Sequence, residues 1–300
     1  MKLALKIDAA TFRGTLVGVP RLVAALRQAE AQATFFFNLG PDRSGRMPGS
    51  LLAASRKDAS ALGRYGLAGL LQGTLLPGPD IGQRCADILR GVHDAGFDSG
   101  VQGWDHAAWQ NGAEQAGAAW TERQMQRAIA RYDSIFGEAP KTHAAAGWQM
   151  NPHALRLTQR LGFGFASDTR GTHPFVPVWN AEVVLCPQLP TTLPTVDELL
   201  DRDGCNVGNV HERLLSLTRD APPTGHVFTA RADLEGQSLL PVFTSLLEGW
   251  KSQGYELVSL GSLFESIDAS RLPRHEVVRG GIEGRAGTLM LQGAEFLAQA

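Results

Sequence analysis

An apolar run, a turn, an amphipathic run and a second apolar run follow one another in LALKIDAATFRGTLVGVPRLVAALRQAEAQATFFFNL (residues 3–39). Residues 3–7 and 34–39 are short and apolar, as buried β-strands are. Residues 17–29 repeat apolar side chains at helical spacing between them. The order strand, helix, strand predicts a βαβ unit, in which the two strands run parallel.

The same alternation continues along the chain. We expect further strands at 97–101, 142–145, 164–167, 183–186, 226–229 and 256–259, and helices at 81–95, 122–136, 152–161, 207–217, 239–253 and 260–267. Strands that alternate with helices predict an α/β protein with a parallel sheet. About seven such units suit a distorted (β/α) barrel.

Two segments depart from this alternation. Residues 47–80 form a long insertion rich in Leu, Gly and Ala, which we interpret as a lid or a docking element. Its part 51–76 mixes leucines with Arg and Lys, so contact with a membrane interface and packing as a lid both stay open. Residues 268–300 show no clear period, and we expect this C-terminal tail to wrap the outside of a barrel formed by residues 1–267 or to stay partly mobile.

Composition excludes several classes of protein. The 28 Lys and Arg against 30 Asp and Glu give a formal charge of −2, which provides no electrostatic footprint for nucleic acid. Cys85, Cys186 and Cys205 are widely spaced and odd in number, which predicts no disulfide framework and fits a reducing cytoplasm. No stretch approaches the roughly 18 apolar residues that a membrane-spanning helix needs.

Acidic residues recur where the predicted strands end. In a parallel barrel the carboxyl ends of the strands meet at one mouth, where reactive groups gather. The residues in question are Asp8, Asp105, Asp168, Asp233 and Glu235. Each one alone is typical of a helix cap or a turn, but several together indicate a functional site.

Five motifs carry a resemblance to a known family. They are Asp8-Ala9-Ala10-Thr11-Phe12-Arg13-Gly14-Thr15, Gly103-Trp104-Asp105-His106, Ala144-Ala145-Ala146-Gly147-Trp148, Ser167-Asp168-Thr169-Arg170-Gly171 and Ala232-Asp233-Leu234-Glu235-Gly236. In this order they resemble the polysaccharide deacetylase (NodB-homology) family, and within it the bacterial deformylases that act on a lipid-linked formamido sugar. The resemblance extends from residue 1 to about residue 267.

The resemblance implies a fold, a reaction and a place. The family is a hydrolase of C–N amide bonds on a distorted (β/α) barrel. This branch removes the formyl group from undecaprenyl-phosphate-linked 4-deoxy-4-formamido-L-arabinose, in the lipid A (lipopolysaccharide) modification that gives antibiotic resistance, here to polymyxin. The implied partners are that amino-sugar lipid and the cytoplasmic face of the inner membrane. The implied cofactor is a divalent metal, with one Asp as base and one His as acid.

Several positions depart from the family pattern. Asp8 matches the base. Ala10 stands at a metal-binding Asp, Gln102 at the first metal-binding His, and only His106 keeps its ligand position. Arg231 replaces the acid His. Alanine has no donor atom, a glutamine amide is a weak neutral ligand, and arginine does not release its proton near neutral pH. The sequence therefore predicts a catalytically impaired protein with a weak or absent metal.

Other positions match the part of the family that binds substrate. These are Arg13, Gly147, Trp148, Asp168 and Arg170, together with the loop 187–194. Arg13 and Arg170 suit a phosphate, although structural ion pairs explain them equally well. We expect Arg231 to pair with Asp8 in place of the metal charge.

Three alternatives stay open beside this leading hypothesis. The first is an active metal-dependent deformylase with a site rebuilt from Asp8, Asp105 and His106. The second is a non-catalytic module that binds the glycolipid. The third, a minor one, is a glycosidase that uses strand-end carboxylates such as Asp8 and Asp233.

Overall fold

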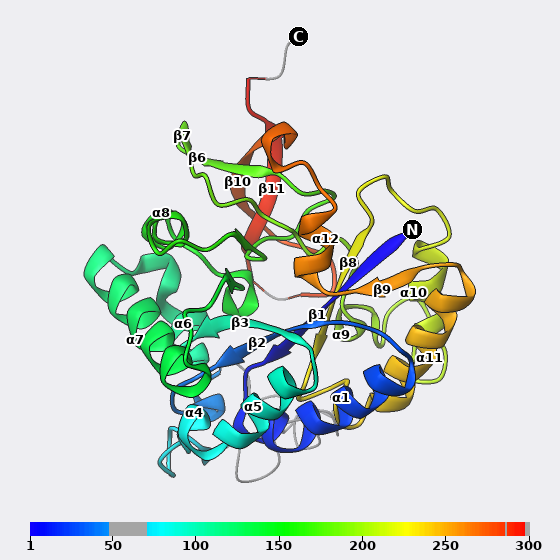
Figure 1. Cartoon of the computed structure of the whole chain (residues 1–300), viewed down its shortest axis with the longest axis horizontal. Helices are drawn as coiled ribbons and strands as arrows, with labels where there is room; N and C mark the ends of the chain where they lie inside the picture. The colour runs from blue at the N-terminus through cyan, green and yellow to red at the C-terminus, as the bar shows by residue number, and fades with distance from the viewer. Residues whose placement is uncertain (48–70, 286, 298–300) are drawn as a thin grey trace.

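A curled parallel sheet forms the centre of the molecule (Figure 1), in a computed structural model that describes residues 1–47, 71–285 and 287–297. The strand order is β5-β4-β3-β2-β1-β8, and β9 pairs with the first residues of β1. The strands are β1 (Lys2–Ala9), β2 (Thr34–Asn38), β3 (Asp98–Gly103), β4 (Thr142–His143), β5 (Phe165–Ala166), β8 (His226–Arg231) and β9 (Glu256–Val258). The predicted α/β class and the distorted barrel are confirmed.

An extended segment lies between the two edge strands of this sheet. Residue 188 forms a parallel bridge with Ala166 of β5, and the Thr192 amide donates to the carbonyl oxygen of Val227 on β8. The loop 187–194 therefore takes the place of a regular strand between β5 and β8. This explains why the barrel is distorted.

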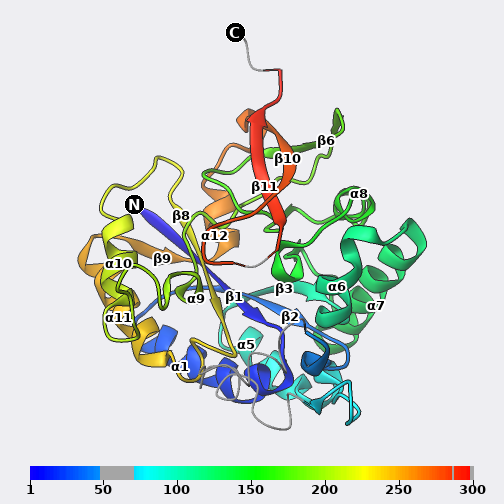
Figure 2. The same ribbon diagram turned by 180° about the vertical axis from the view of Figure 1, so that it is seen from behind.

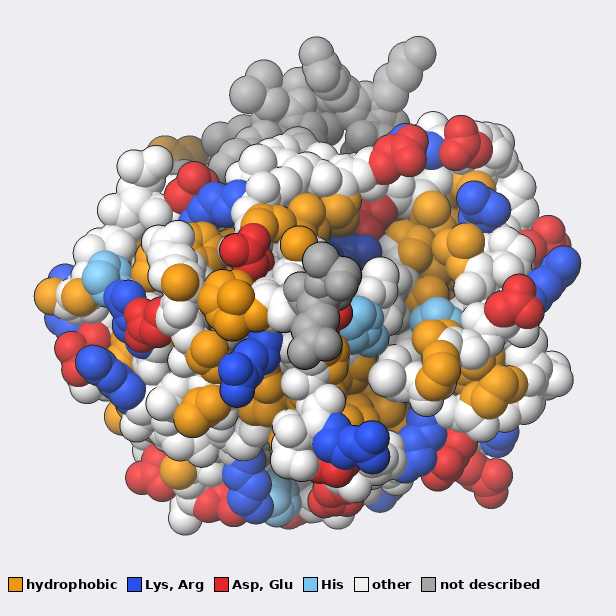
Figure 3. Space-filling model, turned by 90° about the horizontal axis from the view of Figure 1, so that it is seen from above, with side chains coloured by type: hydrophobic (Ala, Val, Ile, Leu, Met, Phe, Trp, Pro, Cys, Tyr) orange, Lys and Arg blue, Asp and Glu red, His pale blue; other side chains and the backbone are white. Residues whose placement is uncertain are grey.

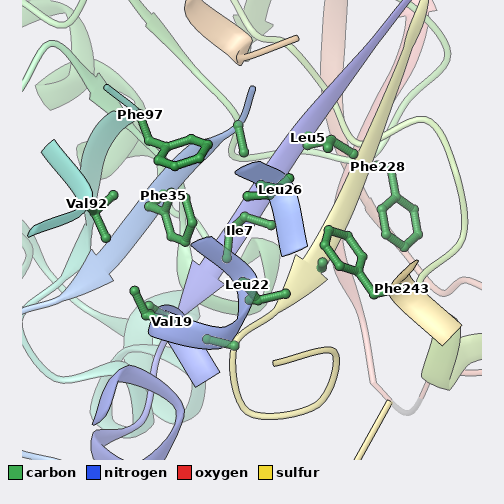
Figure 4. Packing of buried hydrophobic residues seen from close by; sticks show 14 of the residues in the cluster. Leu5, Ile7, Val19, Leu22, Leu26, Phe35, Val92, Phe97, Phe228 and Phe243 are labelled. Carbon is green, nitrogen blue, oxygen red and sulfur yellow. The ribbon is translucent and has the colours of Figure 1, made fainter. Parts of the chain in front are cut away.

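Helices cover the outer face of the sheet and bury its apolar side chains. Leu5 and Ile7 of β1 and Phe35 of β2 pack there against Leu22 and Leu26 of a covering helix (Figure 4). The covering helices are α1 (Val19–Gln28), α5 (Ala86–Asp94), α7 (Ala118–Phe136), α10 (Val210–Leu217) and α11 (Leu240–Ser252). This layer holds the strands in register and leaves their inner face to line the barrel.

The inner face is apolar at the amino ends of the strands and polar at their carboxyl ends. Ala4, Phe36 and Val227 form a small inner cluster with Leu260 and Leu263 of α12 (Leu260–Glu265). Because side chains alternate along a strand, the residues that follow on the same face point into the barrel nearer its mouth. The polar site lies beyond this apolar cluster, toward the carboxyl ends of the strands.

The C-terminal tail forms a hairpin that joins a second sheet, of order β11-β10-β6-β7 (Figure 2). These strands are β6 (Val176–Trp179), β7 (Glu182–Val183), β10 (Arg274–Gly280) and β11 (Leu289–Glu295). A short 3-10 helix, η5 (Ala269–Arg271), precedes the hairpin. The tail thus packs as regular structure against residues that follow β5.

Some sequence predictions need correction. The helix expected over 81–95 is interrupted at Cys85, which separates α4 (Ile81–Arg84) from α5. The strand expected over 183–186 is not part of the barrel, because β7 pairs antiparallel with β6 in the second sheet. The positive φ angles of Asn180 and Ala181 make the tight turn of that hairpin. Most of the insertion 47–80, including much of 51–76, lies outside the described residues.

Candidate functional site

Lys6 and Asp8 lie on the inner face of β1 at the base of the site. Ile7 between them packs on the opposite face, in the outer core. Lys6 Nζ is 3.8 Å from Asp8 Oδ1 and donates a hydrogen bond of 2.9 Å to the carbonyl oxygen of Ser167. Burial raises the pKa of Asp8, against the opposing effect of Lys6 and Arg231, and burial lowers the pKa of Lys6. Asp8 therefore lies near the carboxyl end of β1, with the buried amino group of Lys6 beside it.

The three predicted metal positions come from the mouth of the barrel, but they do not offer a set of metal ligands. Ala10 directly follows β1, Gln102 is on β3, and His106 begins α6 (His106–Gly112). A catalytic zinc normally takes three protein ligands and a water. Among the described residues, no group of three or more His, Cys, Asp or Glu side chains is arranged to hold a metal ion. The donors present do not fit the divalent metal that the family resemblance implies.

Asp105 is already engaged by protein groups. Its Oδ1 caps α6 by accepting a hydrogen bond of 3.0 Å from the amide of Ala108. Its Oδ2 lies 2.7 Å from Arg43 Nη1 in an ion pair. The helix-cap interpretation therefore accounts for Asp105, and a rebuilt metal site would have to break both contacts.

Arg231 forms its ion pair with Asp197, not with Asp8 as expected. Asp197 lies in α9 (Val196–Leu199), a short helix that the sequence analysis did not predict. The backbone amide of Arg231 donates to Glu235 Oε2 at 2.8 Å, and burial raises the pKa of Glu235. Asp8 and Arg231 are nevertheless direct partners in the pairing of β1 with β8, so both belong to the mouth.

Trp148 is buried at the mouth, in a backbone conformation that its motif requires. Gly147 has a φ of 63°, and an added Cβ would lie 2.7 Å from the side-chain nitrogen of Gln110, so a larger residue there would be strained and would displace that side chain. Trp148 itself has a φ of 56°, and its indole Nε1 donates to Thr191 Oγ1 at 3.2 Å. The strained pair of residues holds the indole in one orientation.

Three cations surround the Trp148 ring. Lys6 Nζ lies 5.2 Å from the ring centroid, and the guanidinium carbons of Arg170 and Arg285 each lie 4.9 Å from it. Arg285 comes from the connection between β10 and β11, and its Nη1 is 3.8 Å from Glu198 Oε1. The C-terminal hairpin therefore contributes to the mouth, which the sequence analysis did not predict.

Asp168 and Arg170 are buried in structural contacts. Asp168 Oδ1 lies 2.7 Å from His143 Nδ1 and accepts a hydrogen bond of 2.8 Å from the amide of Ala145. Arg170 Nη1 donates to both carboxylate oxygens of Glu198, at 2.8 and 3.0 Å. Asp168 thus joins the ends of β4 and β5, and Arg170 ties the segment after β5 to α9.

Arg13 is exposed in the turn after β1, where the π-helix η1 (Gly14–Gly18) begins. It is the one predicted substrate-binding residue that lies on the surface. Asp233 and Glu235, from the loop after β8, are 1% and 0% exposed. The structure therefore brings Asp8, Gly147, Trp148, Arg170 and Arg231 toward one mouth and leaves Arg13 at its outside.

Sequence reasoning missed Lys6, Asn38, Glu198 and Arg285. A lysine within an apolar strand was a visible signal for Lys6. No sequence signal marked Arg285, because the Gly-rich segment around it shows neither helical nor strand periodicity.

On the face drawn in Figure 3, no large area carries charges of one sign only. Lys and Arg are interspersed there with Asp and Glu, and hydrophobic areas lie between them. Within the described ranges, no helix has the length and apolar character needed to span a bilayer.

Two curated proteins are similar to this chain over almost its whole length. The probable 4-deoxy-4-formamido-L-arabinose-phosphoundecaprenol deformylase ArnD of Shewanella sediminis is 33% identical over 97% of this chain and 94% of its own. The protein of the same name from Wigglesworthia glossinidia brevipalpis is 27% identical over 93% of this chain and 98% of its own. No family model matches the chain.

Solved structures share the fold. A Mycobacterium smegmatis protein assigned to the polysaccharide deacetylases has a TM-score of 0.63 at 17% identity and covers 94% of both chains. BA3943 of Bacillus anthracis, described as a CE4 family pseudoenzyme, has a TM-score of 0.52 at 14% identity and covers 92% of this chain and 69% of its own. At these identities the likeness concerns the fold alone.

Proposed function

Because this chain belongs to the family of 4-deoxy-4-formamido-L-arabinose-phosphoundecaprenol deformylases, we propose that it binds the family's formamido-sugar lipid but is impaired in hydrolysing it. One observation carries the proposal. Ala10, Gln102 and Arg231 occupy the positions where the resemblance places two metal ligands and the acid. The scaffold of the mouth is kept, while the groups that would drive the reaction are changed.

The loss of chemistry follows from the side chains present. Hydrolysis of a formamide needs a group that polarises the carbonyl, a base for water and an acid for the departing amine. Asp8 supplies a carboxyl group for the base. Arg231 keeps its proton near neutral pH and is held by Asp197, so it is no acid for the amine. Without the metal ligands, no described group replaces the Lewis acid.

The groups suited to binding remain at the mouth. Trp148 offers an indole held by Thr191, next to the ends of β1 and β8. The indole is 3% exposed and contacts Lys6, Arg170 and Arg285, so we infer that it acts on the sugar by holding these cations in place. Lys6, Arg170 and Arg285 place positive charge around Trp148, and Glu198 forms ion pairs with the two arginines.

A rebuilt metal site is the second candidate function. His106 keeps its ligand position, and Asp8 lies near the same mouth. It is less well supported, because Asp105 already caps α6 and pairs with Arg43.

The partner and the place follow from the same family assignment. The sugar is carried on a polyprenyl phosphate, so we infer that the protein works at the cytoplasmic surface of the inner membrane as a peripheral protein. Flotation with liposomes tests this. The protein should float with vesicles that contain the formamido-sugar lipid and should stay at the bottom with vesicles of the same phospholipid alone. If the protein floats to the same extent with both kinds of vesicle, the inference is contradicted.

The decisive experiment measures binding and turnover on one sample. Titration calorimetry in detergent should show binding of a short-prenyl phosphate bearing formamido-arabinose, and a formate assay should show no release on the 1 s⁻¹ scale of ordinary enzymes. The prenyl phosphate without the sugar is the ligand control. Trp148→Leu should weaken binding, whereas the matched variant Trp179→Leu in β6 should not. Formate release at an enzymatic rate would overturn the impairment, and absence of binding would overturn the binding function.

A further inference from the structure

Two buried amide side chains at the mouth have polar atoms without a hydrogen-bonding partner. Asn38, the last residue of β2, is 0% exposed, and Gln102 on β3 is 2% exposed. Neither Nδ2 nor Oδ1 of Asn38 has a hydrogen-bond partner among the described residues, and the same holds for Gln102 Oε1. The two residues lie on neighbouring parallel strands, at the same end of the sheet.

The backbone brings these amides together at an irregularity. In the pairing of β2 with β3, Phe37 faces Val101 but Asn38 faces Gly103, so Gln102 is the extra residue of a bulge. Bulges bend a strand and redirect a side chain, and they are frequent next to functional sites. Ala9 pairs with Phe37, which places Ala10 beside Asn38 in register.

The inner-face position of Asn38 follows from strand alternation. Phe36 belongs to the inner apolar cluster, and the centroid of its ring lies 5.7 Å from Lys6 Nζ. Phe37, by contrast, packs in the outer core. Asn38 thus points to the same side as Phe36 and Lys6, nearer the mouth. The amides lie beyond the level of Asp8, toward the carboxyl ends of the strands.

Burying an amide without a partner is costly, and native proteins seldom do so without a reason. An apolar side chain of the same shape would avoid that cost. Two such amides side by side at the mouth indicate that a ligand completes their hydrogen bonds. A stabilising role for the pair does not explain why three polar atoms lack partners.

We propose that Asn38 and Gln102 form a binding site for the neutral amide group of the ligand. The inference rests on the proposed function and deepens it, since the amide is then the formamido group of the sugar. Asn38 Nδ2 donates to the formyl oxygen, and Gln102 Oε1 accepts from the formamide N–H. Both side chains are uncharged, and together they offer the donor and the acceptor that a neutral amide group needs.

The test uses apolar side chains of similar shape, Asn38→Leu and Gln102→Met. Each should weaken binding of the formamido-sugar lipid about tenfold or more, as loss of a buried hydrogen bond does. Each should also leave the melting temperature unchanged or raise it, because an unpartnered buried amide is removed. Gln124→Met in α7 is the matched control, since Gln124 Oε1 also lacks a partner there. It should leave the affinity unchanged.

Opposite results would overturn the proposal. A lower melting temperature with unchanged affinity would show that the amides serve the fold. If the unaltered protein binds no sugar lipid, the proposed function fails, and the amide site is then tested by itself with N-methylformamide. That probe should shift the side-chain NH₂ signals of Asn38 and Gln102 in the NMR spectrum of the ¹⁵N-labelled protein. Absence of any shift would overturn the amide site.

Discussion

Lys6 Nζ lies 3.8 Å from Asp8 Oδ1 inside the barrel, and the two side chains are 0% and 8% exposed. The pair lies next to Trp148, between the inner apolar cluster and the polar residues of the mouth. Removing one member of a buried pair leaves the other charge without compensation. The pair therefore links the stability of the barrel to the composition of the site.

Lys6→Met should destabilise the protein by about 3–5 kcal/mol, because Asp8 is left buried without its partner. Urea denaturation measures this change in the free energy of unfolding. The double variant Lys6→Met with Asp8→Leu should recover most of the loss, since no lone charge remains. Simple addition of the two single effects would show that the two charges do not interact.

Restoring the ligands and the acid should restore the chemistry. We expect Ala10→Asp, Gln102→His and Arg231→His together to bind close to one divalent metal ion per chain and to release formate from the sugar lipid. Elemental analysis after buffer exchange and a formate assay give the two measurements. The control adds His106→Ala to the triple variant, which should lose the metal. Stoichiometric metal in the unaltered protein would favour the rebuilt site instead.

Arg170 and Glu198 should be coupled in a double-mutant cycle. Their side chains are 10% and 2% exposed and form a bidentate ion pair, so Arg170→Ala and Glu198→Ala should each cost about 3–5 kcal/mol. The double variant should cost clearly less than the sum. Arg170→Lys should not rescue the fold, because an ammonium group does not reproduce the guanidinium geometry. If the two single effects on the free energy of unfolding simply add, the two side chains do not interact, which would contradict the prediction.

His226 should make the protein less stable in mild acid. Burial is the main cause that lowers the pKa of His226 below its ordinary value of 6.5. Between the folded pKa and 6.5 the unfolded chain binds more protons, so the free energy of unfolding rises with pH and falls on acidification below 6.5. His226→Gln should flatten this dependence. The difference between variant and unaltered protein should be constant above pH 7.5, and an identical slope in both proteins would contradict the prediction.

The barrel was predictable because its signals are local. The alternation of Leu3, Leu5 and Ile7 with Ala4 and Lys6 defines a strand, and amphipathic runs define the helices that cover it. The second sheet was not predictable in this way. β6 and β10 pair although nearly a hundred residues separate Val176 from Arg274, and no local pattern reports such a pairing.

The sequence predicted which residues belong to the candidate site better than it predicted which residues they contact. Asp8, Trp148 and Arg231 were found from motifs, and all three belong to the mouth. The partner of Arg231 was wrong, because α9 brings Asp197 to it from a loop with no strong period. Asn38 was missed, since it lies inside the predicted strand 34–39 and belongs to none of the five motifs.

The sequence by itself determined the parallel α/β barrel, because periodicity is a property of the chain alone. Through the family resemblance it also predicted that Ala10 and Gln102 stand at metal-ligand positions. Only the tertiary structure decided that Lys6 pairs with Asp8, that Arg285 reaches Trp148, and that Asn38 and Gln102 lie side by side. These contacts join residues distant in the chain or depend on a bulge. They exist only once the strands have taken their register and the hairpin has packed.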